Sequence, residues 1–234
     1  MGLNVVILKV PAIKANIVSF SGGKDSTAML LMMIEKNIRI DEVIYADVVG
    51  AEFEEMYLHI EKIKSYIPKK IKFTTIRGKM TFEEGIKKYQ WSDFKNRWCT
   101  TVLKTQPIRK YLREKYGKNN YIEYIGIAYD EPKRIKNKKY PLVEWEVTEK
   151  EALEYCYKKG FTWSGLYEEF DRLSCFLCPL QRIGELRTLY NIYPKYWKQM
   201  EKLDKFSDRR FRNDYSLDEL KKKFDNENRK LKLF

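Results

Sequence analysis

Two adjacent glycines, Gly22 and Gly23, stand between an apolar segment that predicts a strand and an apolar segment that predicts a helix. Residues 15–20 have the length and composition of a buried strand, and residues 27–35 those of a packed helix. Free backbone N–H groups and the positive end of the helix dipole meet at such a junction, and glycine lets an anion approach the backbone closely. The run S-F-S-G-G-K-D-S at residues 19–26 therefore predicts a phosphate-binding loop rather than an ordinary Gly-Gly turn.

Strand-like and helix-like segments alternate along the first two thirds of the chain. Strands are predicted at residues 15–20, 41–47, 70–76 and 121–127, with helices at residues 27–35, 53–67 and 105–116. This order predicts an α/β fold with a doubly wound, mainly parallel sheet. Because ligands bind beyond the carboxyl ends of such strands, we expect the loop at Ser21, the turn after Asp47 and the segment after Ile127 to form one site.

The last third of the chain is predicted to be helical. Helices are expected at residues 149–159, 184–193, 195–205 and 217–232. Ser216 and Glu219 have the spacing of a capping box at the start of the last helix, which we interpret as a solvated structural helix rather than a partner-binding tail. We divide the chain into a nucleotide-binding α/β domain over residues 1–182, which includes a cysteine motif, and a helical C-terminal extension over residues 183–234.

The net charge of +13 is unevenly distributed along the 234 residues. Residues 64–139 contain 21 basic and 7 acidic side chains, and residues 195–234 contain 13 and 8, whereas the remainder is acidic. Such a basic segment suits a polyanion or a highly charged nucleotide, although a lysine-rich surface without a binding role would have the same composition. The start of the chain lacks the features of a signal peptide, and the apolar runs are too short to cross a bilayer, so we expect a cytoplasmic protein with no membrane partner.

Three of the four cysteines lie in polar, motif-like surroundings. Cys99 follows Arg-Trp, and Cys175 and Cys178 form a C-x-x-C-P motif, whereas Cys156 falls in a patterned helix and is assigned to packing. A disulfide is disfavoured in a cytosolic chain, which leaves a redox pair, Zn²⁺ or an iron-sulfur cluster. His59 is either a fourth zinc ligand or a partly buried surface residue, and the second alternative is the more common one.

The run S-G-G-K-D-S resembles the PP-loop of the ATP pyrophosphatase superfamily, also called adenine nucleotide alpha hydrolase-like. Further motifs are similar to the phosphoadenosine phosphosulfate (PAPS) reductase family: R-x-C-x-x-x-x-K ending at Lys104, G-x-x-x-D-E-x-x-R at residues 126–134, and C-x-x-C-P. The resemblance covers about residues 16–202. It implies that the protein binds ATP and Mg²⁺ and cleaves ATP between the α and β phosphates.

The same resemblance implies a set of site residues. Nucleotide contacts are expected from Ser19, Ser21, Gly22, Gly23, Lys24, Asp25, Ser26, Asp47, Gly126, Glu131 and Arg134, substrate or phosphate contacts from Arg77, Arg97 and Lys104, and metal ligation from Cys99, Cys175 and Cys178. Lys24 and Asp25 would be catalytic: the lysine offsets charge on the leaving pyrophosphate, and the aspartate positions the loop or Mg²⁺.

Two departures from the family pattern shape the expected activity. Thr100 stands where iron-sulfur members have a second cysteine, so the three remaining cysteines would hold a 4Fe-4S cluster with one iron open to sulfur or substrate. No cysteine follows Cys178 to act as the reductase nucleophile, and Ala128 replaces a common arginine. We therefore expect adenylation of an acceptor for sulfur transfer, the alternatives being a thiol-dependent sulfonucleotide reductase and a non-catalytic nucleotide-sensing subunit. Besides ATP, the partners considered are DNA or tRNA, a sulfur donor such as a cysteine desulfurase, and a second copy of the chain.

Overall fold

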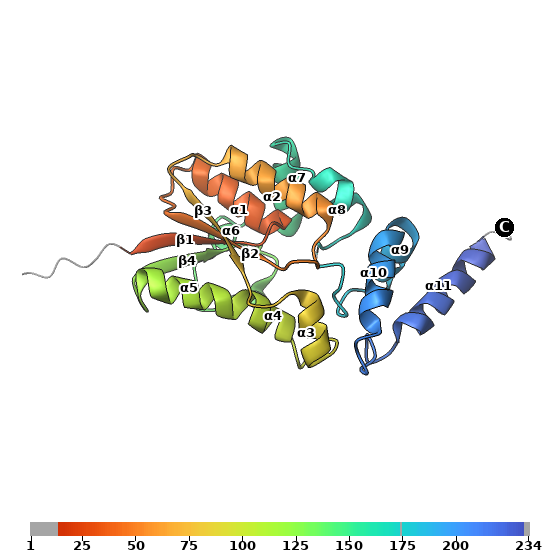
Figure 1. The fold of residues 1–234 in the computed structure, drawn as a ribbon. Helices are drawn as coiled ribbons and strands as arrows, with labels where there is room; N and C mark the ends of the chain where they lie inside the picture. Colours follow the sequence, from red (N-terminus) through yellow and green to blue (C-terminus); the bar gives the residue numbers. More distant parts are fainter. Residues whose placement is uncertain (1–13, 174, 232–234) are drawn as a thin grey trace, which may run out of the picture.

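The computed structural model describes residues 14–173 and 175–231 and contains a parallel sheet with the strand order β3-β2-β1-β4 (Figure 1). The strands are β1 (Ala15–Phe20), β2 (Glu42–Asp47), β3 (Lys72–Arg77) and β4 (Tyr121–Ile125). On β1, Val18 is paired with Val43 of β2 on one side and with Tyr124 of β4 on the other. All three pairings are parallel, which confirms the predicted doubly wound α/β fold.

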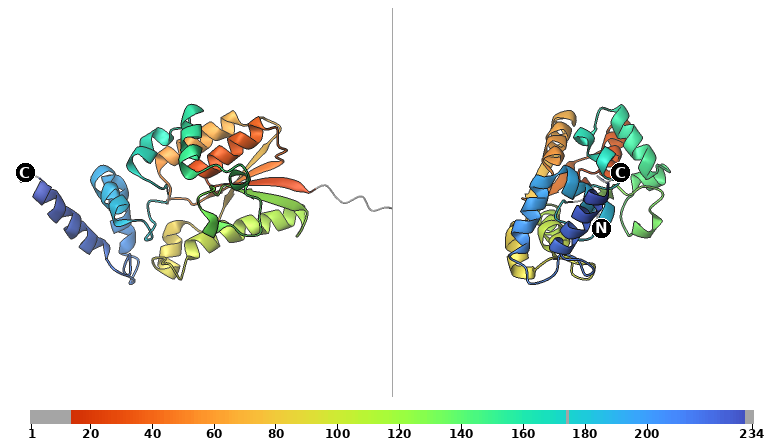
Figure 2. Two further views of the ribbon diagram at one scale, coloured as in Figure 1. Left: turned by 180° about the vertical axis from the view of Figure 1, so that it is seen from behind. Right: turned by 90° about the vertical axis from the view of Figure 1, so that its right-hand side faces the viewer.

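Helices cover both faces of the sheet (Figures 1 and 2). Val18 belongs to the large apolar cluster that includes helices α1 (Lys24–Glu35) and α2 (Glu54–Tyr66). The preceding residue, Ile17, packs in a second cluster with Leu112 of helix α5 (Gln106–Tyr116) on the opposite face. Successive side chains of a strand point to opposite faces, so the neighbouring apolar residues Ile17 and Val18 bury both sides of β1.

The remaining elements are mostly short. They are α3 (Phe82–Tyr89), α4 (Trp98–Thr100), the π-helical turn η1 (Thr101–Thr105), η2 (Pro132–Arg134), α6 (Pro141–Glu144), α7 (Glu149–Lys158), η3 (Trp163–Gly165) and α8 (Leu166–Glu169). Helix α3 was not predicted. It begins with a capping box between Thr81 and Glu84 and buries Phe82 and Ile86.

Strand β4 lies at the edge of the sheet beside β1. Among the described residues, its outer side makes only an isolated bridge, in which the Ile125 amide donates to the Lys139 carbonyl at 3.0 Å and the Lys139 amide donates to the Glu123 carbonyl at 3.2 Å. The prediction extended this strand to Ile127. It ends earlier because the Ile127 amide turns back to the Ile125 carbonyl at 3.1 Å, which breaks the extended conformation.

Helices α9 (Ile183–Ile192), α10 (Pro194–Asp204) and α11 (Leu217–Leu231) lie beyond the end of the sheet toward which the strands run (Figures 1 and 2). The Glu219 amide donates to the Ser216 hydroxyl at 3.2 Å and the Ser216 amide to the Glu219 carboxylate at 2.7 Å, which confirms the predicted capping box. Trp197 and Phe224 belong to the same apolar cluster as the sheet. The boundary at residue 182 stays a prediction. The described helices are too short or too polar to traverse a bilayer.

Candidate functional site

The predicted phosphate loop joins β1 to α1, and aromatic side chains hold it from outside. Gly22 has a φ of 84°, and a β-carbon there would lie 2.8 Å from Sδ of Met56, so the conformation requires glycine. The indole of Trp163 donates to the Gly22 carbonyl at 2.7 Å. The amide of Lys24 donates to the Tyr167 hydroxyl at 2.8 Å. These contacts fix the backbone on both sides of Gly23.

Helix α1 begins at Lys24, three residues before the predicted start, so the second half of the S-G-G-K-D-S run forms its first turn. The Ser26 hydroxyl donates to the Gly23 carbonyl at 3.0 Å and accepts the Ser21 amide at 3.2 Å. The hydroxyls of Ser21 and Ser26 lie 3.0 Å apart. This turn therefore combines two hydroxyls, the amides of a helix N-terminus and one ammonium group, which is a suitable environment for phosphate.

Gly126 brings the segment after β4 against this turn. A β-carbon at Gly126 would lie 2.6 Å from both Cα and N of Ser26. Because no side chain intervenes, Glu131 and Arg134, which follow on the same segment, can face the loop. The structure thus unites two of the three segments that we expected to form one site.

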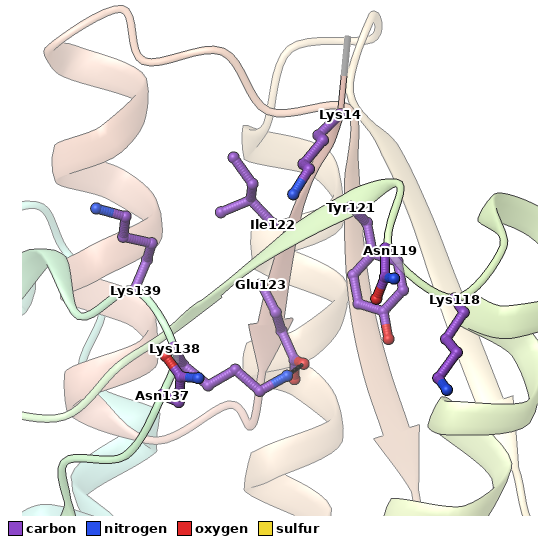
Figure 3. Close-up of a pocket in the computed structure, with 9 residues that line it drawn as sticks. All are labelled: Lys14, Lys118, Asn119, Tyr121, Ile122, Glu123, Asn137, Lys138 and Lys139. Carbon is purple, nitrogen blue, oxygen red and sulfur yellow. Dashed lines mark hydrogen bonds and ion pairs between the residues drawn. The ribbon is translucent and has the colours of Figure 1, made fainter. Parts of the chain in front are cut away.

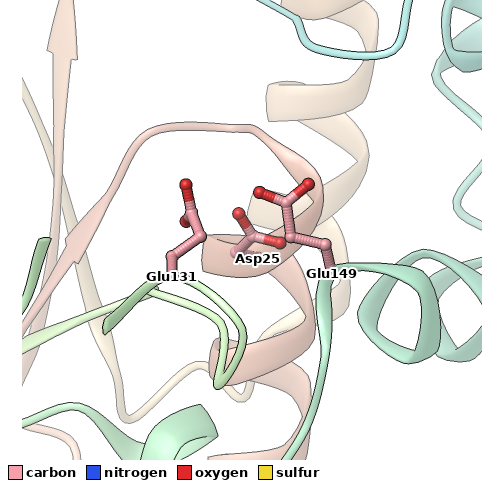
Figure 4. Close-up of side chains that lie close together, drawn as sticks. All are labelled: Asp25, Glu131 and Glu149. Atoms are coloured by element: carbon pink, nitrogen blue, oxygen red, sulfur yellow. The ribbon is translucent and has the colours of Figure 1, made fainter. Parts of the chain in front are cut away.

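Three carboxylates meet beside the phosphate loop (Figure 4). Asp25 on α1 lies between Glu131 and Glu149, and oxygen atoms of the three lie within 4.8 Å of one another. Lys24 forms an ion pair with Glu149 at 3.0 Å, and Arg134 forms one with Glu131. Oδ1 of Asp25 is buried and has no hydrogen-bond partner among the described residues. Burial, followed by the nearby charges of Glu149 and Glu131, raises the pKa of Asp25 to about 6 against the opposing effect of Lys24.

A cavity of about 90 Å³ lies beside the phosphate loop and is lined by most of the residues described above. Of the predicted residues, it is lined by Ser21, Gly23, Lys24, Asp25, Ser26, Gly126 and Arg134. Glu149, Tyr167, Arg172 and Leu173 also line it and were not predicted. The sequence carried a partial signal for two of them, because Glu149 opens an acidic helix and Tyr167 precedes the C-x-x-C motif.

Other predicted nucleotide residues lie elsewhere. Asp47 is buried at the end of β2, where it accepts hydrogen bonds from Arg77 at 2.8 Å and Tyr57 at 3.2 Å. Ser19 lies on the α5 face of the sheet and donates to Glu123 at 2.7 Å. The structure does not place these residues in the cavity beside Lys24, and their roles stay predictions.

The three motif cysteines gather at a second location, beyond the end of β2. The Cys178 amide donates to the Cys175 carbonyl at 3.1 Å, which closes a tight turn between the two. The turn after β2 contacts this segment, since the Phe176 amide donates to the Ala51 carbonyl at 3.1 Å. The Cys99 thiol, on α4, lies 3.6 Å from the Ser92 hydroxyl.

Lys104 and Arg97 supply positive charge to the cysteines. Burial opposes the charge on Lys104, but Glu52 at 3.4 Å, together with Cys175 and Cys99, outweighs it and raises the pKa of the ammonium group. The hydrogen bond from the Cys175 thiol lowers the pKa of Cys178, assisted by Arg97 and Lys104. The predicted substrate contacts Arg97 and Lys104 therefore lie with the cysteines.

Cys156 and His59 are both part of the core. Cys156 is fully buried, and its thiol lies 3.6 Å from the Lys24 carbonyl, in keeping with a packing role. His59 is also buried, with Nε2 at 3.0 Å from the Thr27 hydroxyl and its ring stacked on Trp163. The prediction of a partly buried surface histidine was wrong, because α2 turns this side chain toward α1 and buries it. His59 belongs to no metal-ligand group among the described residues.

A comparison with protein-family models matches residues 15–140 to the phosphoadenosine phosphosulfate reductase domain. The chain belongs to this family. The match contains the phosphate loop, Cys99, Lys104 and the segment from Gly126 to Arg134. The match ends before the C-x-x-C motif of Cys175 and Cys178.

Curated relatives include two uncharacterized proteins of Methanocaldococcus jannaschii. MJ0066 is 30% identical over 203 residues, covering 80% of this chain and 41% of the relative, and MJ0973 is 28% identical over 195 residues, covering 77% and 45%. This chain thus spans less than half the length of either. An uncharacterized nin region protein of phage lambda, ORF290, is 29% identical over 148 residues, covering 53% of this chain and 51% of the relative. Among solved structures, PAPS reductase from Candida auris aligns with a TM-score of 0.49 and 15% identity, covering 73% of this chain and 83% of that protein.

Proposed function

We propose that this member of the PAPS reductase family is an ATP pyrophosphatase that adenylates an oxygen of an acceptor so that sulfur can replace it. The observation that carries the proposal is the arrangement of Asp25, Glu131 and Glu149 beside Lys24 at the N-terminus of α1. Anionic phosphate and a divalent cation can occupy such a site together, because the helix N-terminus and Lys24 attract the first and the carboxylates attract the second.

The carboxylate group fits Mg²⁺ in its chemistry. Magnesium prefers oxygen ligands and is usually bound by one or two carboxylates together with substrate phosphates. Oδ1 of Asp25 is buried without a partner among the described residues, so a cation would relieve an otherwise unfavourable arrangement. Asp25 and one of the glutamates would hold the ion, which would neutralise charge on the pyrophosphate.

The first chemical step needs little more than positioning and charge. The acceptor oxygen attacks the α-phosphorus, the bond from that phosphorus to the bridging oxygen of the β-phosphate breaks, and that oxygen leaves with the pyrophosphate. Lys24, Arg134 and the amides of the first turn of α1 lie around the cavity in which this negative charge would develop. AMP then becomes the leaving group when a sulfur nucleophile attacks the activated acceptor.

The cysteine site supports the sulfur half of the proposal. The thiols of Cys99, Cys175 and Cys178 gather near the ammonium group of Lys104. Three thiolates suit a 4Fe-4S cluster, whose negative charge Lys104 and Arg97 would balance. When bound, a cluster would supply an iron open to exogenous sulfur.

The acceptor and the sulfur donor are proposed by chemistry alone. A nucleic acid, DNA or tRNA, suits the basic segment at residues 64–139, and a cysteine desulfurase would supply sulfur at the persulfide level. A thiol-dependent reductase and a nucleotide sensor are the rivals, and both would leave ATP intact.

The decisive experiment incubates anaerobically purified protein with Mg²⁺, α-labelled ATP, nucleic acid and sulfide as the sulfur nucleophile, and measures AMP and pyrophosphate. The proposal expects both products in equal amounts and their loss on Asp25→Asn. ADP as the product, or no product with any acceptor, would overturn it. Sulfite release from PAPS with thioredoxin would favour the reductase, and tight ATP binding without turnover would favour the sensor.

A further inference from the structure

A groove follows the open edge of the sheet, between β4 and α5. Two adjoining cavities of about 780 and 470 Å³ form it, and they share Lys118, Tyr121, Glu123 and Lys138 (Figure 3). Because β4 makes only the bridge at Lys139 on its outer side, no further strand of the described chain fills this space. We call it the β4–α5 groove.

The groove is strongly basic. It is lined by Lys14, Lys104, Arg109, Lys110, Arg113, Lys118, Lys138 and Lys139, against the acids Glu114 and Glu123. Some of these cations are already neutralised, since Lys138 pairs with Glu123 and Lys110 lies 3.7 Å from Glu114. Arg109, Arg113 and Lys118 are exposed and have no carboxylate partner among the described residues. Their charge is therefore available to an external anion.

The floor of the groove is apolar. Ile108, Leu112 and Ile125 line it, together with Tyr121, which packs in the same apolar cluster as Ile108 and Leu112. Arg109 and Arg113, one helical turn apart on α5, border this floor on the same cavity. A basic rim with an aromatic and aliphatic floor is the combination that binds single-stranded nucleic acid, because phosphates take the rim and unstacked bases take the floor.

We propose that the β4–α5 groove binds a single-stranded segment of nucleic acid and delivers it to the cysteine site. Lys104 lines one end of the groove, and its ammonium group lies 3.4 Å from Glu52. The neighbouring Ala51 carbonyl accepts the amide of Phe176, which follows Cys175, so a strand lying in the groove reaches the place where sulfur would be transferred. A single strand fits better than a duplex, whose paired bases could not contact the floor. The role of the bound strand as a substrate rests on the proposed function. The binding of the strand to the groove does not depend on ATP cleavage.

The test measures anisotropy of labelled single-stranded DNA and RNA of about 16 nucleotides, and of the matching duplexes, against the full chain. Arg109→Ala with Arg113→Ala should weaken single-strand binding at least about tenfold and reduce the slope of log affinity against log salt by about 1.4. The matched control is Lys69→Ala with Lys70→Ala, which removes equal charge from exposed lysines after α2, next to the opposite edge strand β3. It should change affinity less than about twofold.

A second variant tests the floor without changing charge. Tyr121→Leu should weaken single-strand binding by about fivefold or more, whereas Tyr121→Phe, which keeps the ring, should not. Equal losses in the arginine and control variants, or duplex binding as tight as single-strand binding, would overturn the groove. Competition by polyglutamate as strong as that by the oligonucleotide would overturn it too.

The two proposals can fail separately. If the wild-type protein binds the oligonucleotide through the groove but forms no AMP, the adenylation chemistry falls and the groove stands. If it forms AMP while the arginine variant binds nucleic acid as tightly as wild type, the groove falls and the chemistry stands.

Discussion

Gly126 packs so closely on Ser26 that a β-carbon would approach its Cα and N to 2.6 Å. The atoms in the way belong to the backbone of the first turn of α1, which cannot move without displacing Lys24 and Asp25. A residue distant in sequence thus controls how close the acidic segment around Glu131 comes to the phosphate loop.

Gly126→Ala should therefore damage both stability and activity. We expect a loss of about 1 to 3 kcal/mol in unfolding free energy from overpacking, and about 100-fold slower AMP formation from misplacement of the loop. Urea unfolding and product assays measure the two effects. Gly184→Ala is the control, because a β-carbon there meets nothing within 4 Å. Wild-type behaviour of Gly126→Ala would contradict the close packing.

Removing carboxylates should alter the magnesium requirement. Asp25→Asn should reduce AMP formation by at least about 100-fold at saturating ATP, and Glu149→Gln should raise the Mg²⁺ concentration needed for half-maximal rate. A magnesium titration of the initial rate measures both. Glu154→Gln, on an exposed position of the same helix α7, should match the wild type. If the rate of both site variants depended on Mg²⁺ concentration as in the wild type, Asp25 and Glu149 would not be magnesium ligands.

Stability should depend on pH through the sole histidine of the chain. Burial lowers the pKa of His59 from 6.5 to about 3, so between these values the unfolded state binds a proton that the folded state does not. The contribution of the neutral, buried His59 to the free energy of unfolding is complete above pH 6.5. It is lost as pH falls toward 3, at up to about 1.4 kcal/mol per pH unit.

The measurement compares denaturant unfolding of wild type and His59→Gln between about pH 7 and pH 5, the range in which the loss of the histidine contribution begins. The raised pKa of Asp25 changes stability with pH in the opposite direction to His59, but it does so equally in both proteins. The difference between the two curves therefore isolates the contribution of the histidine. Parallel curves would show that His59 is accessible to protons in the folded state.

Glu42 should be important for the packing of α5 on the sheet. Its side chain is fully buried and accepts hydrogen bonds from Lys115 and Tyr111, each at 2.7 Å, and from Tyr116 and Thr74. These bonds overcome the effect of burial and lower the pKa of Glu42 to about 2. Glu42→Ala leaves several hydroxyls without an acceptor and should cost about 2 to 3 kcal/mol in unfolding free energy. The exposed Glu61→Ala should cost less than about 0.5 kcal/mol, and an equal loss in both would argue against the network.

Metal content should separate the cysteines into two groups. Cys99→Ala should lose iron on anaerobic purification, whereas Cys156→Ala, in the core beside Lys24, should retain it. Iron and sulfide analysis with absorption spectra measures this. Iron retained in Cys99→Ala, or zinc in its place in the wild type, would contradict three-cysteine ligation of a cluster.

The parts predicted well from sequence were those with local physical causes. The turn at Gly22 and Gly23 followed from the apolar segments on either side, and the parallel sheet followed from the alternation of strand-like and helix-like segments. The start of α1 was misplaced because Lys24, Asp25 and Ser26 form a helical turn that the polar composition of the loop concealed.

The rest depends on contacts between distant segments. Glu149 joins Asp25 and Tyr167 joins Lys24 only once α7 and α8 have packed on α1, and no spacing in the sequence encodes that approach. The burial of His59 was predicted wrongly for the same reason, because the pattern of an amphipathic helix does not indicate which polar residue lies on its buried face. The β4–α5 groove likewise arises from a strand edge that the sequence pattern does not distinguish from an interior strand.

Trp163 and Tyr167 hold the phosphate loop by its backbone at Gly22 and Lys24. Both bonds join residues of the chain itself, so folding alone supplies the contacts that shape the loop. The entropy lost on ordering the loop therefore reduces the folding stability of the protein and does not reduce its affinity for ATP. Preorganisation of this kind should make nucleotide affinity unusually sensitive to the two aromatic residues, neither of which carries any charge.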